Sequence, residues 1–179
     1  MGLILRSDVP TSLSKKDVIL LENCRLNLVV DLRPPNQAIE KTSAFQYMKD
    51  INYINCRFRS GNRIPKFKSD VINIFKELLS DHQNIAYIAR LILNTKGTIL
   101  FHRTAGKDRT ILIIALLLSV AEVNKEDIIA DYVMPYLYIK PIIEDIKKRH
   151  PNYLIGMESH IPKQWNPFLN TLETLMNIY

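Results

Sequence analysis

Eight consecutive residues, His102–Arg109, have the types and the spacing that bind an anion. They read His-Arg-Thr-Ala-Gly-Lys-Asp-Arg and lie between two apolar runs, 98–101 and 111–120. The first run is rich in β-branched and aromatic residues and predicts a buried strand, whereas the second is long enough for a buried helix. A loop between a core strand and a core helix directs backbone N–H groups and the positive end of the helix dipole at one point. This arrangement favours a phosphate.

Several side chains of this loop suit a phosphate. Gly106 lets the backbone turn tightly, and Arg109 can donate two parallel N–H bonds of about 1.5–3 kcal/mol each to phosphate oxygens. Lys107 either adds positive charge or is an ordinary solvated lysine, and Asp108 either donates a proton or balances Arg109. The predicted phosphate-binding residues are Thr104, Ala105, Gly106, Lys107, Asp108 and Arg109.

Two kinds of phosphate loop compete for this sequence. A nucleotide-binding loop requires glycine five residues before Gly106 and Ser or Thr after Lys107, but Phe101 and Asp108 occupy those positions. The alternative is the loop of the cysteine-dependent phosphatases, H-C-x-x-G-x-x-R-[ST]. The segment HRTAGKDRTI resembles the bacterial-type tyrosine and dual-specificity phosphatases, whose loop reads H-C-T-A-G-K-D-R-T-G, at eight of ten positions.

The two departures from that loop are Arg103, in place of the cysteine, and Ile111, in place of the last glycine. In the family the cysteine attacks phosphorus as a thiolate, with its pKa lowered by the helix N-terminus. Arginine stays protonated and has no nucleophilic lone pair, and loss of a covalent nucleophile costs about a million-fold in turnover. The resemblance implies Asp108 as the general acid and Arg109 as a catalytic phosphate ligand. Arg103 predicts that the chain as written does not hydrolyse phosphate esters by this mechanism.

Arg103 leaves three interpretations open. The chain is a natural inactive phosphatase homologue that still binds phosphate, or an active tyrosine, dual-specificity or phosphoinositide phosphatase in which Arg103 substitutes for the nucleophile, or a non-catalytic interaction module. Two guanidinium groups about 6 Å apart repel by roughly 3 kcal/mol at an effective dielectric of 20. Arg103 and Arg109 should therefore recruit an anion together, or Arg103 should pair with Asp108, turn away, or fill the cradle and exclude phosphate.

Three further residues are candidate supports of the loop. His102 either shapes the loop, as the resemblance implies, or is a satisfied buried histidine. Asp31 and Arg33 follow a predicted strand and either support the loop from its end or form a structural ion pair. Cys24 and Cys56 are interpreted as small buried apolar residues, and neither lies in a motif that could replace the missing thiol.

The remaining sequence predicts an α/β fold that places this loop at a sheet edge. Expected strands are 3–5, 26–32, 51–58 and 98–101. Expected helices are one from the capping box at 14–17, a weak one at 36–49, and others at 70–79, 84–93, 111–120, from 124 and at 163–178, with Pro135 and Pro141 dividing that region. Such alternation favours a mostly parallel sheet flanked by helices, with ligands beyond the carboxyl ends of the strands. The loop at 61–65 and the absence of repeats fit this prediction.

The same family resemblance extends beyond the loop. The family's opening pattern is matched by Arg6-Ser7 and Asp31-Leu32-Arg33, and its helix after the loop by the segment 127–138. Family members usually carry a preceding segment rich in arginine, aspartate and glycine, and this chain begins after that point. We therefore expect one phosphatase-like domain over residues 1–179 without that segment.

The composition of the chain limits the classes of partner that it is expected to bind. The net charge of +6 suits an anionic partner such as a phosphorylated protein, a phosphoinositide, or inorganic phosphate or sulfate. Nucleic acid is disfavoured because basic residues are spread out, with one short group at 57–68. The sequence has no apolar run long enough to span a membrane, no secretion signal, and no metal-binding pattern of cysteine or histidine. We expect a cytoplasmic protein without metal or cofactor.

Overall fold

The computed structural model describes residues 3–58, 68–103, 108–131 and 134. The chain divides into two compact units, and each is considered by itself. The first unit contains Met1–Asn62 and Leu78–Ile113, and the second contains Arg63–Glu77 and Ile114–Tyr179. The single domain expected over 1–179 stays a prediction.

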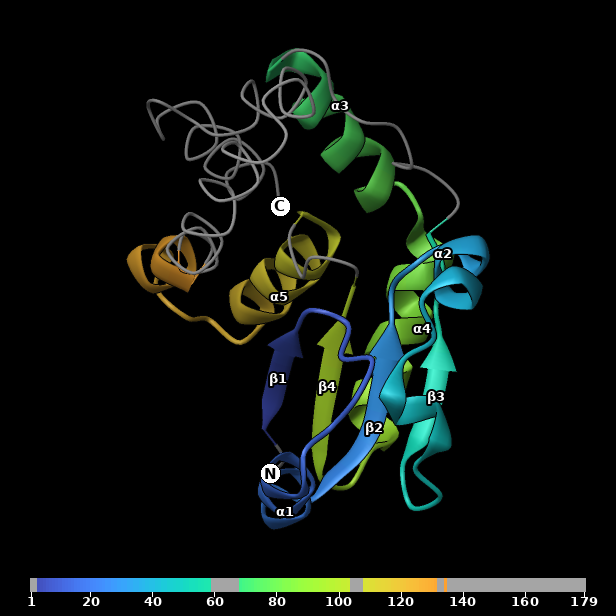
Figure 1. Ribbon diagram of the computed structural model, residues 1–179. Coiled ribbons are helices and arrows are strands. Elements are labelled where there is room, and N and C mark those ends of the chain that lie inside the picture. Colours follow the sequence, from blue (N-terminus) through green and yellow to red (C-terminus); the bar gives the residue numbers. More distant parts are fainter. Residues whose placement is uncertain (1–2, 59–67, 104–107, 132–133, 135–179) are drawn as a thin grey trace, which may run out of the picture. The chain divides into compact units, whose positions relative to one another are not determined.

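The first unit is built on a four-stranded sheet in the order β1-β4-β2-β3, in which every neighbouring pair is parallel (Figure 1). The strands are β1 (Ile4–Ser7), β2 (Leu26–Asp31), β3 (Asn52–Asn55) and β4 (Thr98–His102). Their final residues are in register: His102 pairs with both Ser7 and Asp31, and Asp31 pairs with Asn55. The prediction of a mostly parallel α/β sheet is confirmed, and the four strand ends form one line across its carboxyl edge.

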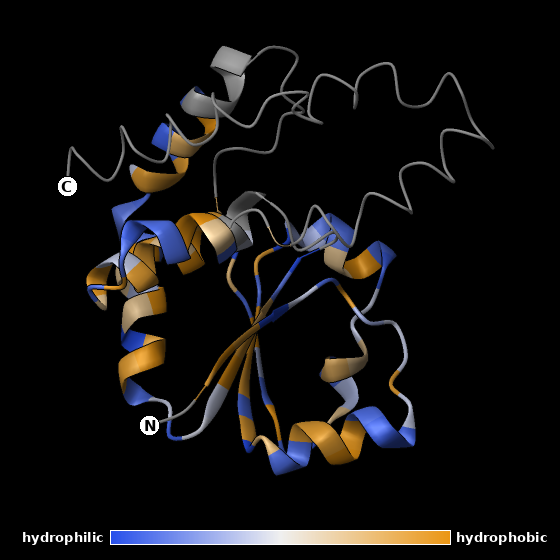
Figure 2. Ribbon diagram, turned by 90° about the vertical axis from the view of Figure 1, so that its left-hand side faces the viewer, coloured by the Kyte–Doolittle hydropathy of each residue, from blue (hydrophilic) through white to orange (hydrophobic). Residues whose placement is uncertain are grey.

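Helices cover both faces of this sheet. Helix α1 (Lys15–Asn23) lies on one face and α4 (His82–Asn94) on the other (Figures 1 and 2). On the first face Leu26, Val29, Phe45 and Leu100 form a buried cluster, against which Leu21 of α1 packs. Since side chains alternate along a strand, Leu28, Val30, Ile99 and Phe101 bury the opposite face. The same alternation puts Asp31, Tyr53 and His102 on the face of the buried cluster.

Helix α1 begins at the capping box that the sequence predicts. The Ser14 hydroxyl accepts a hydrogen bond from the Asp17 backbone N–H at 3.2 Å, and the Ser14 N–H donates to the Asp17 carboxylate at 2.8 Å. These two bonds satisfy donors that would otherwise lack partners at the helix start. The same contacts stabilise the charged form of the Asp17 carboxylate, because the side-chain and backbone hydrogen bonds from Ser14 hold the pKa of Asp17 below its usual range.

One predicted helix is wrong. The segment 36–49 forms two short pieces, α2 (Pro35–Glu40) and the 3-10 turn η1 (Ala44–Tyr47), joined through an extended Ser43. The buried guanidinium of Arg33 explains the break, because its Nη1 donates to the carbonyls of Gln37 and Lys41 at the end of α2. The Lys41 carbonyl is thereby satisfied without a further turn of helix, while the Gln37 carbonyl also accepts from the Lys41 N–H at 3.1 Å.

The other predicted elements hold with shifted ends. Helix α3 spans Lys68–Leu79 and α5 spans Asp108–Val120, so α5 begins three residues earlier than predicted. Another helix starts after Asn124, whose side chain accepts from the Asp127 N–H at 2.9 Å. The predicted loop at 61–65, the proline kinks and the helix at 163–178 lie outside the described residues. Within the described part, no helix has the length and apolarity that crossing a membrane requires.

Candidate functional site

The predicted phosphate loop connects β4 to α5. Strand β4 ends at His102 and α5 begins at Asp108, so residues 103–107 leave the carboxyl edge of the sheet and lead into a helix N-terminus. The strand before the loop and the helix after it are therefore confirmed. Residues 104–107 lie outside the described part of the chain, and so do the side chains of Asp108 and Arg109. Arg103 is described, and its side chain is half-buried.

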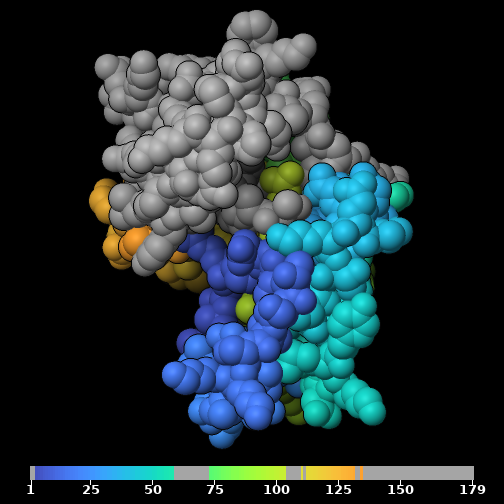
Figure 3. All heavy atoms as spheres, viewed as in Figure 1, coloured from blue at the N-terminus to red at the C-terminus, as the bar shows by residue number. Residues whose placement is uncertain are grey.

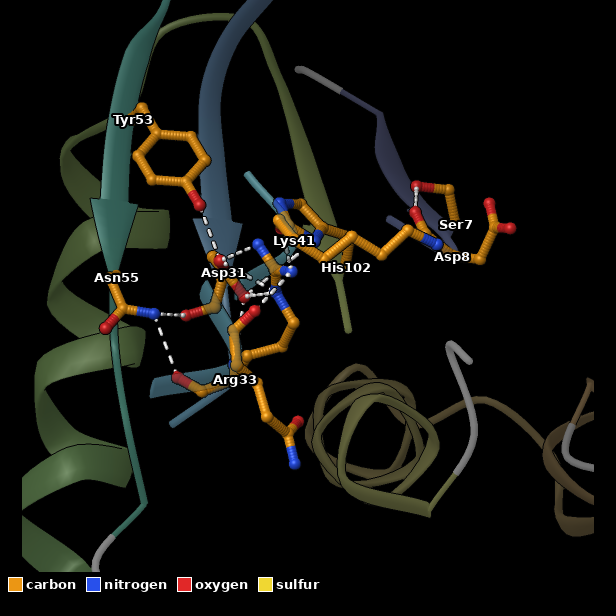
Figure 4. A network of polar contacts seen from close by, with 9 residues as sticks. Ser7, Asp8, Asp31, Arg33, Lys41, Tyr53, Asn55 and His102 are labelled. Atoms are coloured by element: carbon orange, nitrogen blue, oxygen red, sulfur yellow. Dashed lines mark hydrogen bonds and ion pairs between the residues drawn. The ribbon is translucent and has the colours of Figure 1, made fainter. Parts of the chain in front are cut away.

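Asp31 and Arg33 form a buried ion pair beside the end of β4 (Figure 4). Both side chains are fully buried. Arg33 donates from Nε to Oδ1 at 3.0 Å and from Nη2 to Oδ2 at 2.8 Å, and its backbone N–H donates to Oδ1 at 2.9 Å. This fork-to-carboxylate geometry is the strong form of an ion pair and fixes both groups in orientation.

The pair joins three neighbouring elements. Arg33 reaches the end of α2 through the carbonyls of Gln37 and Lys41, at 3.2 and 2.5 Å. Asn55, the last residue of β3, donates from Nδ2 to the backbone carbonyls of Asp31 and Arg33 at 3.1 and 2.9 Å. The carboxyl ends of β2 and β3 and the end of α2 therefore share one hydrogen-bonded network, drawn in Figure 4.

His102 lies at the centre of this edge. Its ring is fully buried, with centroids 6.0 Å from Phe45 and 6.1 Å from Tyr53. In Figure 3 the blue segment that includes α1 and the cyan segment that includes η1 and β3 form most of the coloured surface on the side that faces the viewer. Nδ1 lies 3.8 Å from Oδ1 of Asp31, and among the described residues neither ring nitrogen has a hydrogen-bond partner. The His102 carbonyl accepts from the Leu32 N–H at 3.0 Å, which ties β4 to β2.

Charge in the network is set by burial and hydrogen bonds together. Burial raises the pKa of Asp31, but hydrogen bonds from Arg33 and Tyr53 outweigh it and hold this pKa below its usual value. Burial and the bond to Asp31 raise the pKa of Tyr53 to about 12. Burial lowers the pKa of His102 to about 4, although Asp31 opposes this change. At neutral pH the network is thus a carboxylate, a guanidinium, a phenol and an uncharged imidazole.

These shifts predict that acid destabilises the fold. The pKa of His102 falls from 6.5 to about 4 on folding, so the unfolded chain takes up this proton first as pH falls. The contribution of the uncharged His102 to the free energy of unfolding is complete above pH 6.5, and up to about 3 kcal/mol of it is lost as the pH falls to about 4. Asp31 adds a further loss of stability below its unfolded pKa of 3.8. Urea unfolding between pH 7.5 and 4.5 measures this slope.

Two histidine variants make the pH prediction specific. His102→Asn should flatten the dependence of unfolding free energy on pH between 6.5 and 4.5. His82→Asn removes an exposed histidine at the start of α4 and should leave the slope unchanged. Equal slopes in the wild type and His102→Asn would contradict the assignment of the effect to His102.

Sequence reasoning missed Tyr53, Asn55 and Phe45. The alternating pattern of 51–58 puts Tyr53 and Asn55 on one face of a strand, but the neighbour of that strand depends on sheet order, which no local pattern encodes. The predicted buried position of Cys56 is confirmed, and burial raises the pKa of its thiol to about 11. Cys24 is half-buried, so that part of the prediction is wrong. Among the described residues no group of histidine, cysteine and carboxylate side chains could hold a metal.

Comparisons with known proteins match nearly the whole chain to one family. A sequence model described as the tyrosine phosphatase family matches residues 1–178. A provisionally named tyrosine-protein phosphatase of Cupriavidus necator is 29% identical over 145 residues, covering 73% of this chain and 52% of the relative. A tyrosine-protein phosphatase of Nostoc commune is 40% identical over 60 residues, 34% of this chain and 20% of that protein. The chain thus spans about half or less of the length of these relatives.

Solved structures also resemble the chain. TpbA of P. aeruginosa, in a complex with phosphotyrosine, superposes with a TM-score of 0.41 at 16% identity and covers 73% of this chain and 67% of that one. TpbA in a second crystal structure gives a TM-score of 0.39 at the same identity and coverage.

Proposed function

Because the chain belongs to the tyrosine phosphatase family, we propose that it is a catalytically inactive member that keeps a binding site for a phosphorylated ligand. One observation carries the proposal. Arg103 follows His102 directly at the end of β4, in the position where the resemblance places the nucleophilic cysteine. A guanidinium cannot attack phosphorus, because it has no free lone pair at biological pH. The fold that presents the loop is kept, and the attacking atom is absent.

The binding part of the proposal rests on the elements around the loop. Helix α5 has thirteen residues and begins directly after the loop, so the loop leads into the positive end of the helix dipole, which favours an anion. We assign phosphate oxygens to the backbone of 104–107 and to the guanidinium of Arg109, with Asp108 as counter-charge. His102, Asp31 and Arg33 support the loop from the sheet. Phosphoprotein, phosphoinositide and inorganic phosphate share the chemistry this site would recognise.

The wild-type chain is expected to bind phosphate without turning over its esters. Isothermal titration with inorganic phosphate or phosphotyrosine should show one site, and an assay with p-nitrophenyl phosphate should show no hydrolysis. Arg109→Ala removes charge-assisted hydrogen bonds and should weaken phosphate binding at least about tenfold. Arg90→Ala removes an exposed arginine of α4 and should not. Turnover that Arg109→Ala abolishes would contradict inactivity, and absence of phosphate binding would contradict the retained site.

An active phosphatase is the second candidate, favoured by the eight loop positions that match. In that case Arg103 is a substitution of the nucleophile, and the enzyme with cysteine at this position would hydrolyse phosphotyrosine, phosphoserine or a phosphoinositide. A non-catalytic interaction module is the third. It predicts that the chain has no phosphate role, so that neither the wild type nor a variant with cysteine at this position binds phosphate, and an Arg103 side chain that fills the cradle would favour it.

A further inference from the structure

The Asp31 carboxylate has a fuller set of donors than Arg33 alone supplies. Oδ1 accepts from the backbone N–H and Nε of Arg33, and Oδ2 accepts from Nη2 at 2.8 Å and shares the Nε donor at 3.1 Å. The Tyr53 hydroxyl donates to Oδ2 at 2.5 Å. A carboxylate offers about four acceptor positions, and four donors fill them: the backbone N–H, Nε and Nη2 of Arg33 and the Tyr53 hydroxyl. Among the described residues, Tyr53 supplies the one bond that comes from outside β2 and the residues directly after it.

The saturated carboxylate faces His102 without bonding to it. The distance of 3.8 Å between Nδ1 and Oδ1 lies beyond hydrogen-bond range, and the ring is confined between Phe45 and Tyr53. An imidazole that is fully buried and lacks partners among the described residues would ordinarily turn toward the nearest carboxylate. Here that carboxylate has no acceptor position left.

We propose that Tyr53 is a positioning residue for the phosphate loop: its hydroxyl completes the donor set of Asp31 and so keeps the His102 ring away from the carboxylate. The residue lies on β3, two strands from the loop, and neither the sequence nor the comparisons assign it a role. This positioning role rests on the proposed function, because it acts on the phosphate site only through His102 and Arg103.

The consequence for the loop follows from chain order. His102 is the last residue of β4, and Arg103 is the first residue of the connection. If Asp31 lost the phenol, Oδ2 would have an acceptor position free, toward which the His102 ring could turn. The ring and the backbone that carries it would then move together at the point where the loop begins. A binding site tolerates only about 0.5 Å of such movement before its donors lose their geometry.

The charges around His102 support this account. Asp31 from β2 and Asp8 after β1 favour the protonated ring, whereas Arg33 and burial oppose it. Figure 4 shows Asp8 beside His102, on the side opposite Tyr53. In the wild-type chain, burial holds the pKa of His102 near 4. Freeing one oxygen of Asp31 strengthens the strongest of the groups that favour the proton.

The test compares Tyr53→Phe with Tyr47→Phe in the full chain. Both substitutions delete one phenolic oxygen, but Tyr47 is 78% exposed on η1 and lies outside the network. Two-bond ¹H–¹⁵N NMR spectra of the histidine rings, assigned with His102→Asn, report the charge and tautomer of His102 against pH. Tyr53→Phe should raise the proton affinity of His102 roughly tenfold and weaken binding of inorganic phosphate about fivefold. Tyr47→Phe should change neither quantity.

Each outcome decides the proposal. His102 signals that are the same in Tyr53→Phe and wild type would overturn it, as would altered signals with unchanged phosphate affinity. A wild type that binds no phosphate contradicts the proposed function instead. The NMR spectra distinguish this outcome from a failure of the Tyr53 proposal, because they need no ligand. If Tyr53→Phe does not fold, the wild type still tests the arrangement. His102 signals that report a hydrogen bond from the ring to the Asp31 carboxylate overturn the proposal, and signals of an uncharged ring without that bond support it.

Discussion

Arg103→Cys is expected to give the chain the ability to hydrolyse p-nitrophenyl phosphate. The cysteine would stand between the buried His102 and the first turn of α5, where a helix N-terminus lowers the pKa of a thiol and yields a thiolate at neutral pH. Because removing a covalent nucleophile costs about a million-fold elsewhere, restoring one should raise turnover by at least about a thousandfold, even with Ile111 in place of the family's glycine. Single-turnover and steady-state assays of the purified variant measure the gain.

Matched variants separate the nucleophile from the lost charge. Arg103→Ser removes the guanidinium as Arg103→Cys does but supplies no thiolate, so it should bind phosphate and remain inactive. Cys56→Ser, combined with Arg103→Cys, should leave the turnover of the Arg103→Cys variant unchanged, because burial raises the pKa of the Cys56 thiol to about 11. A folded Arg103→Cys chain that binds phosphate but stays inert would show that more than the nucleophile is missing. One that binds none would favour the interaction module.

Much of the fold could be predicted from the sequence, because the patterns that determine these elements involve residues close together in the chain. Apolar runs of strand length at 26–32 and 98–101, separated by helical patterns, predict a parallel sheet, and β2 and β4 follow within a residue or two. The capping box at Ser14 and Asp17 starts α1 where expected, since its two bonds form between residues three apart. Each of these features depends only on neighbours in sequence.

The features that sequence reasoning missed depend on neighbours in space. The helix expected over 36–49 breaks because Arg33 folds back on the carbonyls of Gln37 and Lys41, a tertiary effect that propensity does not include. Tyr53 joins the site because β3 pairs with β2, a partnership set by the order of the strands. The sequence allows Asp31 and Arg33 either role, support of the loop or a structural ion pair. The structure shows the pair, and the support of the loop remains the proposal.

Asp31→Ala is expected to destabilise the first unit more than any other single change in the network. It leaves the Arg33 guanidinium fully buried without its carboxylate and leaves the Tyr53 hydroxyl without an acceptor. Removing one member of a buried pair typically costs about 3–5 kcal/mol, a large share of the 5–15 kcal/mol that usually stabilises a domain. Urea unfolding at pH 7.5, followed by circular dichroism, measures the loss.

The comparison variants decide whether this loss belongs to the ion pair. Asp50→Ala removes an exposed carboxylate just before β3 and should change the free energy of unfolding by less than about 0.5 kcal/mol. Arg33→Met combined with Asp31→Leu removes both charges and keeps apolar volume. It should be less destabilised than Asp31→Ala, because no uncompensated charge stays buried. The double variant still loses the bonds from Arg33 to the end of α2, so α2 should become more accessible to protease. A loss below about 1 kcal/mol in Asp31→Ala would mean that water reaches Arg33, and the carboxyl edge of the sheet would then not be the closed network from which His102 and the loop are held.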